Sequence, residues 1–125
     1  MMQKRFGLPA EERIRKRDDF ERVFQQGRRL RSGPIFARWV PNGLDHPRMA
    51  VAIRTAFGNS PQRNRAKRLL REAYRLNKHE MPPGVDIIFL PSYDWNTPHL
   101  TQLEEAMRHI AGMLRRAIAG SEGEK

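Results

Sequence analysis

A chain of 125 residues with 24 Lys and Arg against 14 Asp and Glu carries a formal net charge of +10. Such an imbalance destabilises a compact fold through self-repulsion, so it indicates a polyanionic partner, with nucleic acid first and an anionic membrane surface second. The absence of cysteine excludes disulfides, dithiol redox chemistry and thiolate zinc sites.

The length fits a single domain over residues 1–125. No apolar run is long enough to cross a membrane, and the first residues lack the apolar stretch of a secretory signal. We therefore expect a cytoplasmic protein with no membrane partner. Mobile ends are expected at about 1–12 and 120–125, where glycine and charged residues are frequent.

The first predicted helix lies in RDDFERVFQQG, residues 17–27. Phe20, Val23 and Phe24 recur at the spacing of one helix face. Two aspartates stand where a helix N-terminus favours negative charge, and Gly27 stands where the helix is expected to end.

Two or three strands are predicted next. Residues 28–34, RRLRSGP, suit a short edge strand, and residues 34–43, PIFARWVPNG, alternate between two faces. One face carries Ile35, Ala37 and Trp39, and the other carries Phe36, Arg38 and Val40. Residues 48–54, RMAVAIR, follow a turn-rich connection, so we predict that they form a hairpin with the strand before them.

A strongly basic helix is predicted over residues 60–78, SPQRNRAKRLLREAYRLNK, with Ser60 as N-cap and Pro61 at the first position. On a helical wheel, Ala66, Leu69, Leu70, Ala73 and Leu76 share one half, while Asn64, Lys67, Arg68, Arg71, Arg75 and Lys78 lie opposite. Charged helix faces are usually only solvated, but most mix both signs. A nearly uniform positive face is unfavourable for the helix itself and indicates bound phosphates. Glu72 is expected to pair with Arg68.

The rest of the chain predicts a buried strand at 85–91, VDIIFLP, and a long amphipathic helix at 99–119. One face of that helix carries Leu100, Leu103, Met107, Ile110, Leu114 and Ile118. The predicted fold is therefore α+β: a single mixed sheet of about four strands with three helices, in the order α-β-β-β-α-β-α. The segment from 49 to 91 is a candidate parallel crossover, which would ordinarily be right-handed.

The stretch RNRAKRLLREAYR, residues 63–75, resembles the signature helix of the protein subunit of bacterial ribonuclease P. That pattern is RNR, one variable residue, KR, two variable residues, then R. The chain matches it at Arg63, Asn64, Arg65, Lys67, Arg68 and Arg71. DFERVFQQG is similar to the family's first helix, FGN precedes the motif as in the family, and the element order agrees from about residue 13 to 119.

The resemblance implies an accessory subunit of an endoribonuclease that removes the 5′ leader of precursor tRNA. It implies that a partner RNA with bound Mg²⁺ performs the hydrolysis, that the protein binds no cofactor or small-molecule substrate itself, and that the crossover is left-handed. The residues agree, because no nucleophile motif or phosphate-binding glycine loop is present and the four histidines lack metal-ligand spacing. No residue of the chain is expected to be catalytic.

Two RNA-binding surfaces follow from the resemblance. The partner RNA is expected to contact Arg63, Asn64, Arg65, Lys67, Arg68, Arg71 and Arg75, with Asn64 either structural or holding a hydrated Mg²⁺ indirectly. The leader is expected to contact Phe20, Phe24, Phe36, Arg38 and Arg54, where aromatic rings stack bases without sequence demand. For the two phenylalanines of the first helix, plain core packing is an equal alternative.

The chain departs from the family pattern in places. Arg38 stands where the family often has an aromatic residue, and Thr55 and Ala56 stand where it commonly has two lysines, with Arg54 just before. The alternative function is a ribosomal or other structural RNA-binding protein without a role in tRNA processing. A membrane-surface protein fits less well, since the apolar half of the basic helix lacks Trp and Phe.

Overall fold

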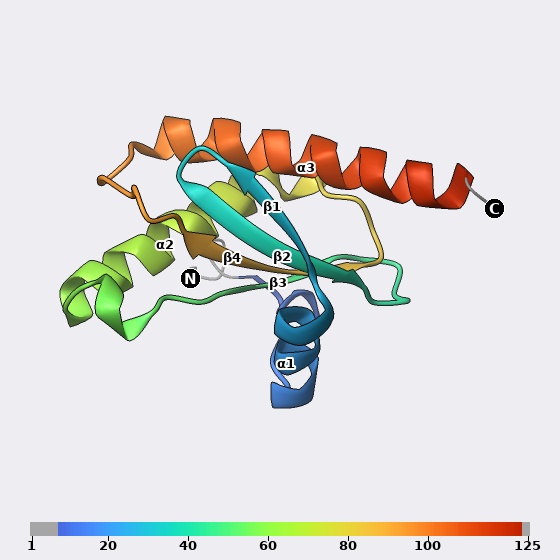
Figure 1. Ribbon diagram of the computed structural model, residues 1–125, viewed down its shortest axis with the longest axis horizontal. Coiled ribbons are helices and arrows are strands. Elements are labelled where there is room, and N and C mark those ends of the chain that lie inside the picture. Colours follow the sequence, from blue (N-terminus) through green and yellow to red (C-terminus); the bar gives the residue numbers. More distant parts are fainter. Residues whose placement is uncertain (1–7, 124–125) are drawn as a thin grey trace.

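The computed structural model describes residues 8–123, with side chains through residue 120. Its main elements are α1 (Arg17–Gln26), β1 (Arg28–Ser32), β2 (Ile35–Pro41), β3 (Arg48–Val51), α2 (Ser60–Asn77), β4 (Val85–Pro91) and α3 (Leu100–Gly123). Short 3-10 helices are η2 (Ala10–Glu12), η3 (Thr55–Phe57) and η4 (Lys78–Glu80). The predicted α+β order is confirmed. Figure 1 shows α2 and α3 on one side of the sheet and α1 on the other.

The four strands form one mixed sheet in the order β1-β2-β4-β3. β1 and β2 form an antiparallel hairpin, with the turn at Gly33, whose φ of 52° suits glycine. The predicted hairpin between β2 and β3 is wrong, because β4 lies between them, antiparallel to β2 and parallel to β3. β4 is buried along its whole length, and a strand apolar on both faces is stabilised most at the centre of a sheet.

The parallel pairing of β3 with β4 confirms the crossover through α2. Its hand stays a prediction: left-handed from the family resemblance, against the right-handed rule.

The alternation of β2 separates two cores. Ile35, Ala37 and Trp39 face the core formed with α2 and α3, which also contains the buried α3 residues Leu103, Met107, Ile110 and Leu114. Val40 faces a smaller core under α1, formed with Ile14, Val23, Ile88 and Leu90. Leu76, expected in the buried half of α2, is 38% exposed.

A buried ionic network attaches α1 to the sheet beside the smaller core. Asp86 of β4 is fully buried and accepts hydrogen bonds from Arg48 Nε at 2.8 Å and Nη2 at 2.6 Å. Arg22 of α1 donates to the same carboxylate at 3.2 Å, and Asn42 donates at 2.9 Å. The Asp86 hydrogen bond raises the pKa of Arg48 above its usual value. The network therefore fixes the orientation of α1 over the sheet.

Part of each end that was expected to be mobile lies in a helix. Ala10–Glu12 form η2, where Glu12 pairs with Lys78 at 2.9 Å, and α3 continues to Gly123. The remainder of both expected ends, residues 1–7 and 124–125, lies outside the described residues.

Candidate nucleic-acid interface

The basic helix α2 begins at a capping box. The Asn59 side chain accepts from Gln62 N at 2.9 Å, and the Gln62 side chain accepts from Asn59 N at 2.8 Å. Ser60, predicted as N-cap, is therefore the first helical residue instead. Asn59 is the better cap because its side chain and that of Gln62 accept reciprocally from each other's backbone, which satisfies two free N–H groups at once.

The basic face of α2, meaning Asn64, Arg65, Lys67, Arg68 and Arg71, is left open by the fold. Asn64, Arg65, Arg68 and Arg71 are exposed, and Lys67 is half-buried. Within the part of the chain that the structure describes, the four cations of this face form no ion pair with an acidic side chain. The face therefore presents uncompensated positive charge to solvent.

A further cation of α2, Arg75, is compensated within the fold. Glu72 pairs with Arg75 at 2.8 Å, where the sequence predicts a pair with Arg68. The contact lowers the pKa of Glu72 and raises that of Arg75. Arg75 was predicted to contact the partner RNA. Because Glu72 neutralises part of its charge, Arg75 should attract phosphates less strongly than the cations of the basic face.

Arg63, the first arginine of the motif, turns back toward the loop that precedes α2. Its guanidinium donates to the Gly58 carbonyl oxygen at 2.5 Å, to Ser60 Oγ at 3.1 Å and to the Thr55 carbonyl oxygen at 3.4 Å. These contacts satisfy backbone acceptors of the segment between β3 and α2. Arg63 is thus a positioning residue for this loop.

We expect Arg63→Ala to loosen residues 54–60 while α2 stays folded. Each lost hydrogen bond to a charged donor is worth about 1.5–3 kcal/mol, so amide hydrogen exchange in this loop should accelerate by tenfold or more, as mass spectrometry would measure. Arg65→Ala, which removes an exposed cation two residues on, is the matched control and should leave the exchange unchanged. Equal protection in both variants would contradict the positioning role.

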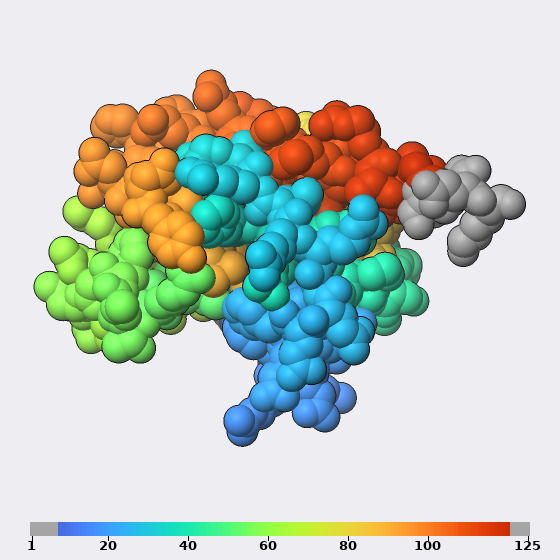
Figure 2. Space-filling view, viewed as in Figure 1, coloured from blue at the N-terminus to red at the C-terminus, as the bar shows by residue number. Residues whose placement is uncertain are grey.

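A groove of about 530 Å³ lies between α1 and the sheet. It is lined by Phe24, Arg29, Leu30, Arg31, Phe36, Ala37, Arg38, Arg54, Leu90 and Tyr93. In Figure 2, α1 (blue), the β1–β2 hairpin (cyan), α2 (green) and the segment after β4 (orange) occupy the same face. Four of the five residues expected to contact the leader, all except Phe20, are therefore brought together.

Arginine guanidiniums stack on the aromatic rings of this groove. Arg38 lies 5.6 Å from the Phe24 ring centre and also donates to the Phe24 carbonyl oxygen near the C-terminus of α1. Arg31 lies 5.1 Å from the Phe36 ring, and Arg54 lies 5.2 Å from the Tyr93 ring. Such contacts are cation–π interactions. They hold flat aromatic and guanidinium surfaces at the groove wall.

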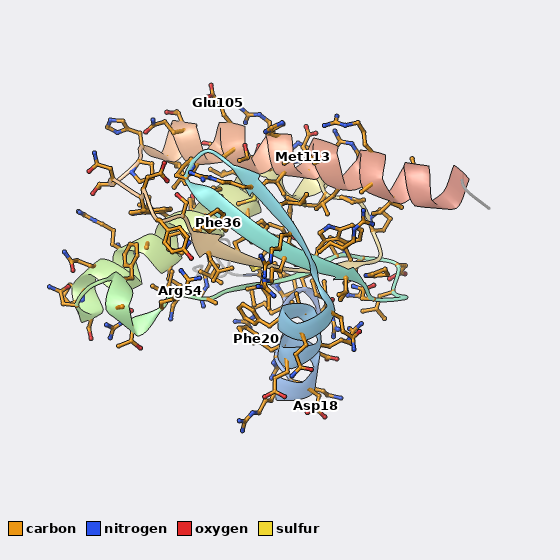
Figure 3. The ribbon with its side chains drawn as sticks, in the orientation of Figure 1. Asp18, Phe20, Phe36, Arg54, Glu105 and Met113 are labelled. Carbon is orange, nitrogen blue, oxygen red and sulfur yellow. The ribbon has the colours of Figure 1, made fainter. Side chains whose placement is uncertain are left out.

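Phe20 lies beside the groove. Its ring centre is 5.1 Å from that of Phe24, and it packs, half-buried, on the smaller core with Val23 and Ile88. Figure 3 shows Phe20 on α1, while Phe36 and Arg54 lie between α1 and α2 in that view. Phe20 therefore packs on the core, as the alternative prediction has it. Phe24 both packs on the core and lines the groove.

Sequence reasoning missed Tyr93. It follows the buried strand β4 in a polar turn, is 82% exposed, and its ring lies edge-on to Phe36 at 5.5 Å. A large aromatic residue in a polar turn after an apolar strand was the available signal. Arg29 and Arg31 of β1, which the sequence analysis did not assign to the leader, also line the groove.

The described residues contain no group of three or more His, Asp or Glu side chains placed to hold a metal ion. Asn64 offers one amide oxygen on a face that otherwise carries only cations, so it does not fit as a direct ligand of Mg²⁺, which prefers carboxylates and phosphates. None of the described helices has the length and apolarity needed to span a bilayer.

The ribonuclease P family model matches residues 8–115. The chain belongs to the ribonuclease P protein family. It is 42% identical over 80 residues to the ribonuclease P protein component of Petrotoga mobilis, covering 64% of this chain and 68% of that relative. It is 35% identical over 104 residues to the ribonuclease P protein component of Pelotomaculum thermopropionicum, covering 83% of this chain and 90% of that relative.

Solved ribonuclease P proteins share the fold. The protein from Thermotoga maritima superposes with a TM-score of 0.71 at 29% identity, over 80% of this chain and 94% of that one. The Staphylococcus aureus protein, at 24% identity, shows the fold alone, with a TM-score of 0.69. The chain is thus a protein subunit of ribonuclease P, a tRNA-processing ribonuclease, and the comparisons give no support to the structural RNA-binding alternative.

Proposed function

We propose that the basic face of α2 binds the catalytic RNA of ribonuclease P and that the groove binds the 5′ leader of precursor tRNA. The protein then assists endonucleolytic removal of the leader in the cytoplasm, and the partner RNA with its Mg²⁺ carries out the hydrolysis. The observation that carries the proposal is the groove itself, an arginine- and aromatic-lined channel next to a helix face of uncompensated cations.

The basic face suits a folded RNA because its charge is fixed in place by a packed helix. Ala66, Leu70, Ala73 and Tyr74 bury the opposite side of α2, so the face cannot rotate away. Arg65, Arg68 and Arg71 are free to bind phosphates, and each contact releases condensed counterions. Affinity gained in this way carries no sequence information, which suits recognition of an RNA by its shape.

The groove suits a single strand of variable sequence. Phe24, Phe36 and Tyr93 present ring faces or edges, and arginines lie between them. Base–aromatic stacking is sequence-tolerant and contributes about 1–3 kcal/mol per base, while the guanidiniums bind the backbone phosphates. The rings are held by tertiary contacts, so little conformational entropy is lost when a strand binds.

The cation requirement of the reaction belongs, in this proposal, to the RNA. Asn64 can contribute only through a water molecule of a hydrated Mg²⁺ that RNA phosphates already hold. Phosphodiester hydrolysis needs an activated water and stabilised leaving oxygen, and the described residues offer no carboxylate cluster for that task. The role of this chain is binding and positioning.

The leader assignment is tested with Phe36→Ala in the reconstituted holoenzyme. We expect affinity for precursor tRNA to fall roughly 5- to 150-fold, the range of one base–aromatic stack, with affinity for mature tRNA unchanged, as equilibrium binding would measure. Leu44→Ala, which truncates another partly exposed apolar side chain, in the loop between β2 and β3, is the control. An equal loss for both tRNAs would assign Phe36 to the core instead.

A further inference from the structure

A second hollow of about 300 Å³ opens from the groove near the start of α2. It shares Arg54, Leu90 and Tyr93 with the groove. Its own walls are Ala56 and Phe57 from η3, Pro91 at the end of β4, and Ser92 and Trp95 from the segment that follows. The two hollows are therefore adjacent and are divided by the Arg54–Tyr93 pair; we call this second one the side pocket.

Hydrogen bonds on both sides of Tyr93 fix the turn that carries it, although the Tyr93 ring is exposed. Ser92 Oγ donates to Asp94, and Arg31 Nη2 donates to both Asp94 carboxylate oxygens at 3.1 Å. The Ser92 hydrogen bond, with smaller contributions from a backbone hydrogen bond and the Arg31 charge, lowers the pKa of Asp94, so this carboxylate stays ionised at neutral pH. Ser92 N also donates to the Pro34 carbonyl oxygen at 2.9 Å. The turn thus holds Tyr93 outward.

Aromatic walls line the far side of the side pocket. The Phe57 and Trp95 ring centres lie 6.1 Å apart at 73°, an edge-to-face arrangement. Both side chains are half-buried, so each keeps a surface open to the hollow. Phe57 belongs to the loop that Arg63 fixes through Thr55 and Gly58. Three aromatic residues and one arginine therefore converge on a space of nucleobase size.

We propose that the side pocket binds one unstacked base of the precursor-tRNA leader, in addition to those in the groove. Arg54 contacts the phosphate between that base and its neighbour in the groove, and Tyr93 separates the two bases. This inference rests on the proposed binding of the leader in the groove. Because the walls are aromatic and none of the described residues lining the pocket has a side-chain amide, recognition is by stacking and has weak base preference.

The test scans the leader with a single abasic nucleotide at each successive position, in the reconstituted holoenzyme. With wild-type protein, one position beyond those sensitive to Phe36→Ala should cost roughly 5- to 150-fold in affinity when its base is absent. In Trp95→Ala and Phe57→Ala, the same base removal should cost nothing further, because its stacking partner is already lost. Trp95→Phe, which keeps a ring, should restore most of the sensitivity.

A second readout needs no variant. Trp39 is 3% exposed in the main core, so the tryptophan emission of the full chain responds to ligands through Trp95. A single-stranded leader oligonucleotide should quench this emission. The same oligonucleotide with an abasic nucleotide at the critical position should bind with less quenching.

The outcomes separate the two proposals. Loss of precursor affinity in Phe36→Ala together with unchanged abasic sensitivity in Trp95→Ala and Phe57→Ala would overturn the side pocket and leave the groove intact. No effect of Phe36→Ala would overturn the groove assignment itself. Unquenched Trp95 emission on binding a complete leader oligonucleotide would also exclude a base in the side pocket.

Discussion

Asp86→Asn is expected to lower the thermal unfolding midpoint by about 10 °C. The substitution keeps the size of the side chain and removes the buried carboxylate that pairs most closely with Arg48 and Arg22, leaving them only the longer contacts with Asp19. Removing one partner of a buried ion pair costs roughly 3–5 kcal/mol. Because Arg48 and Arg22 reach solvent, we take the lower value, which corresponds to about 10 °C for a domain of this size.

The same substitution should also impair leader binding, because the network positions α1. Asp86 connects β4 to Arg22 of α1, and α1 carries Phe24 into the groove. Calorimetry would measure the midpoint, with Asp45→Asn as control, since that carboxylate is fully exposed and pairs with its neighbour His46 on the surface. A midpoint equal to that of the control would show that the network contributes no net stability.

Arg68→Glu is expected to weaken binding of the ribonuclease P RNA roughly 10- to 100-fold at moderate salt, because it removes one phosphate contact and adds a repulsive charge. Arg68 is exposed at the middle of the basic face, and it forms no ion pair with an acidic side chain among residues 8–120. If the wild-type protein neutralises about six phosphates, its affinity should fall about a thousandfold between 50 and 200 mM salt. The slope should be smaller by about one unit in the variant.

Arg116→Glu on α3 changes the net charge by the same amount at another exposed position. It is the matched control, and it should weaken binding far less, because it alters only the long-range field. Equal losses in Arg68→Glu and Arg116→Glu would show that net charge, and not the basic face, determines affinity. A flat salt response of the wild-type protein would exclude phosphate contacts altogether.

The sequence predicts the elements of this fold better than their pairing. Helical spacing on α2 and α3 and the run of β4, apolar except for Asp86, are local patterns, so each is visible in its own segment. The partner of β2 is not local. Both β3 and β4 can extend a sheet from β2, and the choice depends on which strand is buried on both faces, which is a property of the assembled molecule.

The basic face was predictable because helical periodicity alone defines it. The groove was predictable only in part, since Tyr93 comes from a separate connection that the fold brings beside Arg54. The inward turn of Arg63 was hidden as well, because it depends on the path of the loop before α2. A motif pattern assigns residues to a surface. Only the structure separates the residues that face solvent and can bind RNA from those, such as Arg63, that position the neighbouring loop.

The most direct measurement is leader removal from precursor tRNA by a bacterial ribonuclease P RNA at low magnesium, with and without this protein. We predict that cleavage requires the wild-type chain under these conditions, that Arg116→Glu supports it, and that Arg68→Glu supports it poorly unless the protein concentration is raised. No stimulation by the wild-type chain at any magnesium concentration, with RNA binding intact, would contradict its role as the protein subunit of this enzyme.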